Sequence, residues 1–318
     1  MMRALVFRRG RLSELSALPA IAASVKDRSS TVWIDVDAPT AEELAWLGKA
    51  MSLHELTIED LSKRNQRPKI EQYENYVFIV VRAFREGKAM GTAQMNMVLA
   101  GNCLATVSFE PVTAQDELYE RVKKNRFFIS LGADYLLYAV MDRILDSFFP
   151  YASELTEKLD ALEDAVFAER GGWILNRAFE AKKQLFAFRK EVSPVRDMAN
   201  SLARMEVRLI KQKTSHYFRD VYDHLVRIID TIELNRDLVS NIMDAYLSQI
   251  NNSLNKTMKR LTAISVMLMP PTLLASTFGM NFKVIPESDW EYGFYLIILL
   301  MVLMVGWSYY YFKKEDWL

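Results

Sequence analysis

The sequence predicts an α+β domain followed by long helices and a two-helix membrane domain. Three observations lead to this fold class. The first 130 residues mix short apolar runs with amphipathic segments, whereas every long segment from residue 133 onward has helical periodicity. Residues 261–280 and 292–312 carry no charged side chain. Each is about twenty residues long, which is the length that spans a hydrocarbon core.

The N-terminal region, residues 1–130, is expected to be a mixed α/β domain. Thr40 followed by Glu43 has the spacing of a capping box and predicts the start of a helix. Further helices are expected over 54–63 and 113–124. Alternating or continuous apolar runs predict strands at residues 4–7, 31–36, 76–84, 94–100 and 103–109.

Residues 131–216 are expected to form helical arms. Segments 134–149 and 151–168 read as one helix or as two helices separated at Pro150, and a second arm follows over 173–191. Another helix is expected after Pro194. The outgoing arm is acidic and the returning arm is basic, which predicts that they pair electrostatically. These charges are Glu154, Glu157, Asp160, Glu163 and Asp164 on the first arm, and Lys182, Lys183, Arg189 and Lys190 on the second.

A stalk helix is expected over residues 217–260, continuous with a first membrane helix over 261–280. Apolar residues recur along it with four-three spacing, which is typical of helices that associate with one another. A loop over 281–291, a second membrane helix over 292–312 and a basic tail over 313–318 complete the chain. Self-association of these helices would build a symmetric stalk.

Charges that flank the two apolar segments predict the topology. A basic collar of Lys256, Lys259 and Arg260 precedes the first segment, Lys313 and Lys314 follow the second, and the loop between them is mainly acidic. Basic flanks stay on the cytoplasmic side. Both termini and the α/β domain are therefore expected in the cytosol, with the chain in the cell (inner) membrane. Because residues 1–9 lack the apolar core of a signal peptide, the C-terminal helices are expected to direct insertion.

The tripeptide Gly279-Met280-Asn281 lies in the turn between the two apolar segments. This position predicts an ion-selecting site at the mouth of whatever the helices enclose. Two spans cannot enclose a polar path, so a conduit requires a homo-oligomer with one helix per subunit at its axis. The first segment contains Thr and Ser residues and Pro270-Pro271, which suit either a polar lining or tight helix packing.

Other chemistry is not indicated by the sequence. The three histidines are scattered without zinc-site spacing, and no nucleotide-binding loop or Ser-His-Asp arrangement is found. Cys103, the single cysteine, lies in an apolar run and is expected to be buried and inert. Basic and acidic residues balance at 40 each, which gives no indication of nucleic acid as a partner. The chain is expected not to be an enzyme and to use no organic cofactor.

The chain resembles the CorA family of divalent-metal transporters along nearly its whole length. The resemblance is carried by six co-linear segments: RPKIE (67–71), ENYVFIV (74–80), ADYLLY (133–138), FRDVYDH (218–224), FGMNF (278–282) and YFKKEDWL (311–318). It implies a funnel-shaped homopentamer in the lipid bilayer that moves Mg²⁺, with Co²⁺ and Ni²⁺, into the cytosol. The membrane potential would drive this flow.

The resemblance also implies roles for individual residues. Gly279, Met280 and Asn281 would form the selectivity site, where a ring of Asn281 carbonyl oxygens binds hydrated Mg²⁺. Glu287 would attract cations in the outer loop, and the basic collar would lie outside the pore. The pore and its gate would be lined by Asn255, Met258, Leu261, Met269 and Thr272.

The resemblance also has implications for regulation and for the choice of ion. Asp220 matches one ligand of a regulatory Mg²⁺ site between subunits. Its partner carboxylates are expected within residues 84–95, where only Glu86 is acidic, so metal feedback would be weakened or built from other acids. Two alternatives stay open: a Zn²⁺ transporter of the same superfamily (the ZntB type), and a membrane-anchored scaffold or sensor.

Overall fold

A computed structural model describes residues 2–84, 91–168, 172–280 and 290–317. The chain divides into two compact units, Met1–Ile242 and Met243–Leu318, which are described separately. The expected α+β region, long helices and two apolar C-terminal helices are all confirmed.

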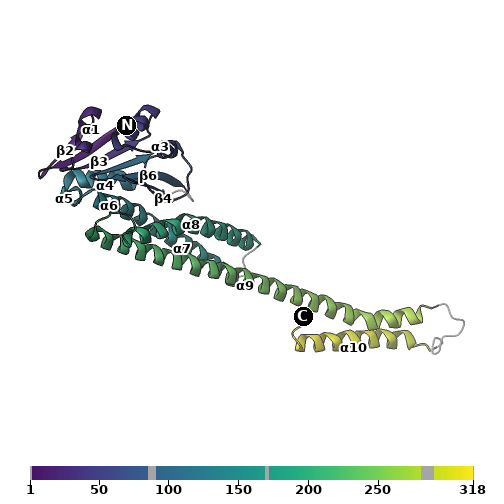
Figure 1. Ribbon diagram of the computed structural model, residues 1–318. Coiled ribbons are helices and arrows are strands. Elements are labelled where there is room, and N and C mark those ends of the chain that lie inside the picture. The colour runs from purple at the N-terminus through teal and green to yellow at the C-terminus, as the bar shows by residue number, and fades with distance from the viewer. Residues whose placement is uncertain (1, 85–90, 169–171, 281–289, 318) are drawn as a thin grey trace. The chain divides into compact units, whose positions relative to one another are not determined.

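The N-terminal part of the first unit contains a seven-stranded sheet (Figure 1), with strand order β2-β1-β3-β7-β6-β5-β4. Among the described residues, β3 and β7 pair in parallel and every other pair of neighbouring strands is antiparallel. All five expected strands are confirmed, whereas the two edge strands β2 and β4 were not predicted. The bounds are β1 Met2–Arg8, β2 Arg11–Leu15, β3 Ser30–Asp37, β4 Lys69–Gln72, β5 Val77–Phe84, β6 Thr92–Ala100 and β7 Cys103–Ser108.

Helices cover both faces of this sheet. One face packs against α1 (Leu18–Lys26), α2 (Ala41–Met51) and α3 (Glu55–Ser62) through a core that includes Ile34, Phe78 and Leu47. Helix α6 (Ala133–Asp146) contacts β3, β5, β6 and β7, and α4 (Thr113–Lys124) packs on α6. A short α5 (Phe127–Ser130) connects α4 and α6. Because the central strands are covered on both sides, they read as continuous apolar runs.

The predicted capping box at the start of α2 is confirmed. The Glu43 amide donates to Thr40 Oγ1 over 3.1 Å, and the Thr40 amide donates to the Glu43 carboxylate over 2.9 Å. We expect Thr40→Ala to lower the free energy of unfolding by about 1 kcal/mol, because the Glu43 amide loses its side-chain acceptor. Denaturant unfolding would measure this, with exposed Ala41→Ser as the control that keeps both cap bonds. An unchanged midpoint in Thr40→Ala would contradict it.

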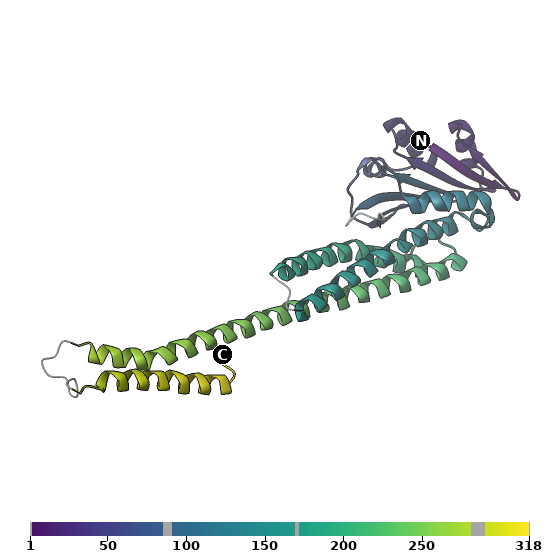
Figure 2. The same ribbon diagram turned by 180° about the vertical axis from the view of Figure 1, so that it is seen from behind.

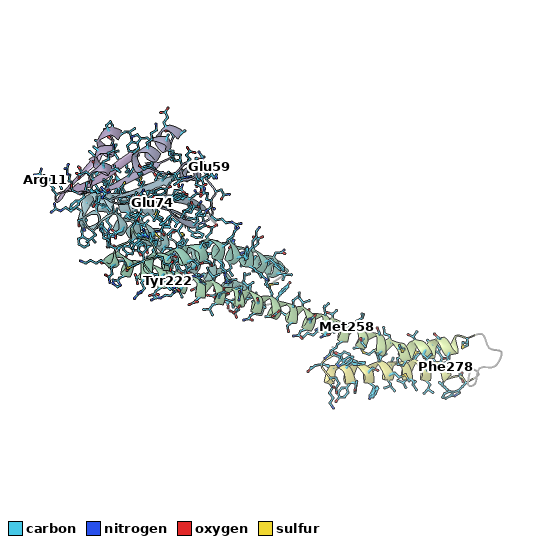
Figure 3. The ribbon with its side chains drawn as sticks, in the orientation of Figure 1. Arg11, Glu59, Glu74, Tyr222, Met258 and Phe278 are labelled. Carbon is cyan, nitrogen blue, oxygen red and sulfur yellow. The ribbon has the colours of Figure 1, made fainter. Side chains whose placement is uncertain are left out.

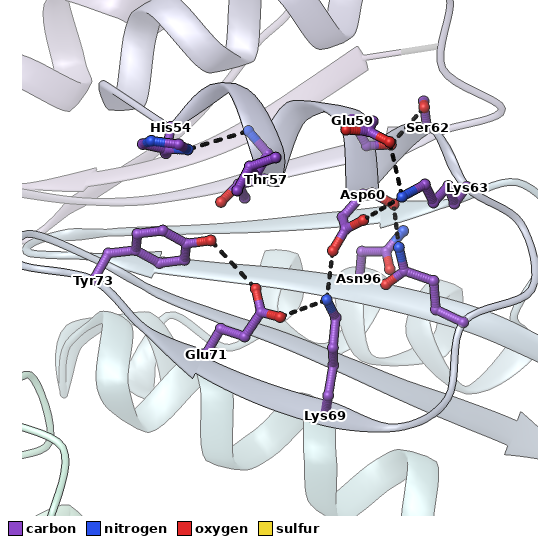
Figure 4. Close-up of polar contacts among 12 residues, drawn as sticks. His54, Thr57, Glu59, Asp60, Ser62, Lys63, Lys69, Glu71, Tyr73 and Asn96 are labelled. Atoms are coloured by element: carbon purple, nitrogen blue, oxygen red, sulfur yellow. Dashed lines mark hydrogen bonds and ion pairs between the residues drawn. The ribbon is translucent and has the colours of Figure 1, made fainter.

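A network of ion pairs holds the edge strand β4 against α3 (Figure 4). Lys69 bridges Asp60 on α3 and Glu71 on its own strand, and Asp60 also pairs with Lys63 at 2.9 Å. Although partial burial would raise the pKa of Asp60, the two ammonium groups lower it overall. Lys69 thus forms one ion pair with α3 and one within β4. The network anchors a strand that is too short and polar to be recognised from sequence.

Two proline residues behave differently from the sequence prediction. The first arm breaks at Ser147, between α6 and α7 (Phe148–Phe167), and Pro150 lies in the first turn of α7. That turn has no intrahelical amide bond to lose, so proline is tolerated there. Helix α8 (Trp173–Ala203) runs through Pro194 rather than ending before it. Val192 and Val195 are buried on either side, and this packing offsets the lost hydrogen bond.

Helices α7, α8 and the first part of α9 lie side by side in the first unit (Figure 2). Aromatic rings of Phe84, Phe148, Tyr151 and Phe188 pack with centroids 4.6–6.1 Å apart and join α7 and α8 to β5. Among the described residues no ion pair joins α7 to α8, so the predicted electrostatic pairing of the arms is not found. Instead, apolar stripes face each other and Arg189 pairs with Glu233 on α9.

The second unit contains the C-terminal part of α9 (Gln212–Phe278) and α10 (Gly293–Lys314). Both helices are long and apolar enough to cross a membrane, and only 11% of the apolar window in each is buried. Such exposure distinguishes them from the core helices of a water-soluble protein. A small cluster of Ala263, Met267 and Phe312, with Trp317 packed against it, joins the two helices.

Candidate functional site

The five predicted pore residues share one stripe of α9. At 100° per residue, Asn255, Met258, Leu261, Met269 and Thr272 fall within an arc of about 120°. Met258, Leu261 and Met269 expose 64–66% of their surface in the single chain, and Figure 3 shows Met258 on this helix. A row of large apolar side chains left open by the chain's own fold requires cover from lipid or from further copies.

Thr272 contributes a hydroxyl group to this stripe. The hydrogen bond that the hydroxyl donates determines which of its atoms can bind a ligand. Its Oγ1 donates to the Leu268 carbonyl over 2.7 Å, so the lone pairs of the oxygen remain available as acceptors. Pro270 and Pro271, which directly precede Thr272, lie inside the helix and cannot donate to the carbonyls of Val266 and Met267 one turn earlier. This part of α9 therefore presents oxygen acceptors within an otherwise apolar segment.

Only part of the predicted selectivity tripeptide lies within the described residues. Gly279 and Met280 follow the end of α9, where the Gly279 amide donates to the Ala275 carbonyl over 2.9 Å. Asn281 and Glu287 lie outside the described residues. Gly279 does not adopt positive φ, so its conformation does not by itself require glycine. A Cβ there would meet the Ala275 oxygen at 3.2 Å, and this close approach explains the glycine.

In the second unit, the basic collar includes a residue, Lys259, that lies close in space to Trp317, near the end of the chain. Lys256, Lys259 and Arg260 are exposed on α9. The Lys259 ammonium lies 5.9 Å from the centre of the Trp317 ring, which is tilted by 36° against the Phe312 ring at 5.5 Å. This cation–π contact joins the collar to the segment that follows α10, and a role for Trp317 was not predicted from the sequence.

Asp220 is solvent-exposed on α9, 3.8 Å from His224 Nε2. The structure places Asp142 of α6 nearby, and sequence reasoning missed this residue. Burial raises the pKa of Asp142, and the negative charges of Asp146 and Asp220 raise it further. Three carboxylates from two helices therefore lie within electrostatic reach of one another, and His224 and Arg143 lie beside them. Glu86, the other predicted contributor, lies outside the described residues.

A second acidic group lies at the carboxyl end of β3, beside α4, and its charges are already paired within the chain. Oxygen atoms of Asp35, Asp37 and Asp116 come within 4.8 Å of one another. The Arg3 guanidinium lies among them, 2.7 Å from both Asp35 and Asp116. Burial alone would lower the pKa of Arg3, but these carboxylates raise it above its usual value. Because Arg3 already supplies the positive charge, the group is a structural ion-pair cluster.

Asp35 should make stability depend on pH. Burial raises its pKa to about 6, although Thr106 and Arg3 hydrogen-bond to it. A raised pKa means that the folded state favours the neutral acid, so stability is greatest below pH 4 and falls as pH rises towards 6. We expect a loss of roughly 2–3 kcal/mol across this window relative to Asp35→Asn.

Denaturant unfolding of the full chain at pH 4 to 7 would measure this difference. Asp197→Asn, an exposed carboxylate on α8, is the matched control and should parallel the parent protein. Equal pH slopes for the parent and Asp35→Asn would show that the carboxylate stays ionised throughout.

Comparisons with known proteins cover nearly the whole chain. Residues 28–314 match the family described as "CorA-like Mg2+ transporter protein". The cobalt/magnesium transport protein CorA of Thermotoga maritima is 35% identical over 298 residues, 92% of this chain and 85% of that protein. The protein of that name from Methanocaldococcus jannaschii is 26% identical, covering 90% and 91%.

Solved structures share the fold. The complete CorA magnesium transporter from Methanocaldococcus jannaschii has a TM-score of 0.84 at 23% identity, covering 99% of this chain and 98% of that one. The ZntB cytoplasmic domain from Vibrio parahaemolyticus has a TM-score of 0.65 at 14% identity, covering 79% and 98%.

Proposed function

The chain belongs to the CorA family of Mg²⁺ transporters, and from this premise we propose that it carries Mg²⁺, and also Co²⁺ and Ni²⁺, into the cytosol. The observation that carries the proposal is the match over 92% of the chain to a relative named as a cobalt/magnesium transport protein. The protein would be a channel-like transporter in the cell membrane rather than an enzyme. A potential of 100 mV favours inward movement of a divalent cation by about 4–5 kcal/mol.

The conduit would be the axis of a homopentamer. One chain contributes two apolar helices, which cannot surround a polar path, and its predicted pore stripe is exposed. Five copies of α9 around an axis would cover that stripe and place it inside. Both chain termini and the whole first unit would then lie on the cytoplasmic side, because the basic collar and Lys313–Lys314 flank the membrane helices.

Selection would take place at the Gly279-Met280-Asn281 turn. Mg²⁺ gives up its water reluctantly, so a ring of Asn281 amide oxygens would bind the hydrated ion through its water shell. Neutral oxygens hold the ion weakly enough to let it proceed. Thr272 and Asn255 would provide two further oxygen rings. Met258, Leu261 and Met269 would form constrictions that close by excluding water.

Feedback by cytosolic Mg²⁺ would act at Asp220. Asp142 supports this assignment, because the two carboxylates already influence each other and a bound divalent cation would neutralise both. Closure would follow when the ion joins this region to an adjacent subunit. Asp220 would then report the cytosolic Mg²⁺ concentration to the same helix that lines the pore.

Flux measurements in proteoliposomes would test this function. With a potential negative inside, we expect uptake of Mg²⁺, Co²⁺ and Ni²⁺, reduced when Mg²⁺ is supplied on the cytosolic side. Zn²⁺ uptake without Mg²⁺ uptake would favour the alternative Zn²⁺ transporter, whose cytoplasmic domain shares this fold. No flux of any of the four ions would support the membrane-anchored scaffold instead.

A further inference from the structure

Helix α8 presents two phenylalanine side chains to solvent in the first unit. Phe186 exposes 72% of its surface and Phe179 exposes 50%, although both lie far from the apolar membrane helices in sequence. Their spacing of seven residues places them on one face of the helix, opposite the buried stripe that packs on α7. Lys183 and Lys190 lie on the same face. Exposed aromatic side chains on a charged helix indicate a contact surface.

A matching surface occurs on the same chain, between α7 and α9. A groove of about 290 Å³ is lined by the apolar side chains of Phe149, Ala152 and Ile228 and by the polar side chains of Ser153, Thr156, Glu157, Arg227 and Thr231. The exposed face of α7 beside it carries Glu157, Asp160 and Asp164. This surface offers an apolar floor, with Glu157 and the acidic face of α7 on one side and Arg227 of α9 on the other.

The charges on both surfaces are unpaired within the part of the chain that the structure describes. No ion pair there involves Lys183 or Lys190 on α8, or Glu157 or Asp164 on α7. By contrast, Arg189 on α8 and Glu154 on α7 are paired with Glu233 and Lys158. The unpaired charges named on the two outward faces therefore have opposite signs, whereas Arg227, which lines the groove and forms no ion pair among the described residues, is a positive charge beside Glu157.

We propose that these two faces bind each other between neighbouring copies of the chain. Phe186 of one copy would insert into the groove between α7 and α9 of the next, with Lys183 placed against Glu157. This proposal rests on the homo-oligomer of the proposed function and adds the contact that closes its cytoplasmic ring. Two different patches make the contact heterologous, the type that generates closed rings.

The levels of the two patches along the helices support this pairing. Helices α7 and α8 run antiparallel (Figures 1 and 2). Glu157 lies ten residues before Phe167, the last residue of α7, and Lys183 lies ten residues after Trp173, the first residue of α8. Rotation about an axis parallel to these helices keeps equal levels opposite each other. Phe186 then faces the level of Ser153, which lines the groove.

Thiol cross-linking of the full chain in detergent would test the contact. Cys103 is fully buried, so the parent protein supplies a low background. We expect the double variant Lys183→Cys with Glu157→Cys to form a ladder of covalent multimers, and adding Phe186→Ser to reduce the ladder at least tenfold. Lys183→Cys paired with Glu42→Cys, an exposed site on α2, is the matched control and should give no ladder.

Charge reversal gives an independent test of the same contact. Lys183→Glu alone, or Glu157→Lys alone, should raise the concentration at which the oligomer dissociates by roughly tenfold, and combining them should restore it. Native mass spectrometry of diluted samples would measure this. The proposal would be overturned if the double reversal failed to restore assembly. It would also be overturned if the single variant Lys183→Cys formed covalent dimers, because that would place Lys183 of two copies against each other.

The outcome is separable from that of the proposed function. A protein that forms the ladder but carries no Mg²⁺ would retain this interface and lose the transport assignment. A protein that carries Mg²⁺ without forming the ladder would keep the transport assignment and lose the interface. Protection of Phe186 by anionic phosphatidylglycerol vesicles, in place of cross-linking, would assign the α8 face to lipid and also overturn the interface.

Discussion

Replacing Asn281 with alanine is expected to abolish Mg²⁺ uptake. The substitution removes the only side-chain oxygen of the Gly279-Met280-Asn281 turn, and with it the proposed ring that binds the water shell of the incoming ion. A pore that has lost its binding site cannot concentrate Mg²⁺ at its mouth. We expect flux in proteoliposomes to fall by roughly a hundredfold or more, to the level of protein-free vesicles.

The matched control is Asn252→Ala. Asn252 is an exposed asparagine on α9 that lies outside the pore stripe, so its loss should leave uptake unchanged. Both variants should keep the parent melting temperature, which separates lost selection from lost folding. If Asn281→Ala took up Mg²⁺ at the parent rate, the selectivity site could not be assigned to this turn.

Replacing Leu261 with asparagine is expected to open the pore. Leu261 exposes 65% of its surface on the pore stripe, and a ring of leucines closes a path by repelling water. Asparagine has a similar size but hydrogen-bonds water, so it removes the barrier without widening the path. With cytosolic Mg²⁺ high enough to suppress flux in the parent protein, we expect at least tenfold greater uptake by Leu261→Asn.

Leu261→Met serves as the control for this experiment, since it keeps an apolar side chain of similar volume. Its flux should stay suppressed. Equal flux through the parent and Leu261→Asn would mean that the closed state does not depend on the polarity of this position, and would assign the gate to another part of α9.

Much of the fold could be predicted from the sequence, because its signals are long or local. Five strands were found from continuous apolar runs, and the capping box at Thr40 from two residues. The two membrane helices were found from uncharged length alone. Strands β2 and β4 were missed because each is short and half-exposed, and ion pairs such as those of Lys69 hold β4 in place.

The site was predicted less completely, for reasons that are equally physical. Spacing along one helix places Met258 and Leu261 on one stripe, since periodicity is a property of sequence. It does not reveal that Asp142 of α6 lies near Asp220 of α9, because that proximity depends on how the helices pack. Trp317 was missed for the same reason, as its contact with Lys259 appears only when α9 and α10 lie together.

The paired prolines of α9 have a mechanical consequence. A regular α-helix resists bending because each amide is tied to a carbonyl one turn away, and Pro270 and Pro271 remove two successive ties. We therefore expect α9 to bend most easily between Val266 and Pro271. Met258 and Leu261 precede this bendable segment in the helix, and Thr272 follows it. In the proposed pentamer, the apolar constriction at Met258 and Leu261 and the oxygen ring of Thr272 would therefore be able to change diameter separately, each without straining the other.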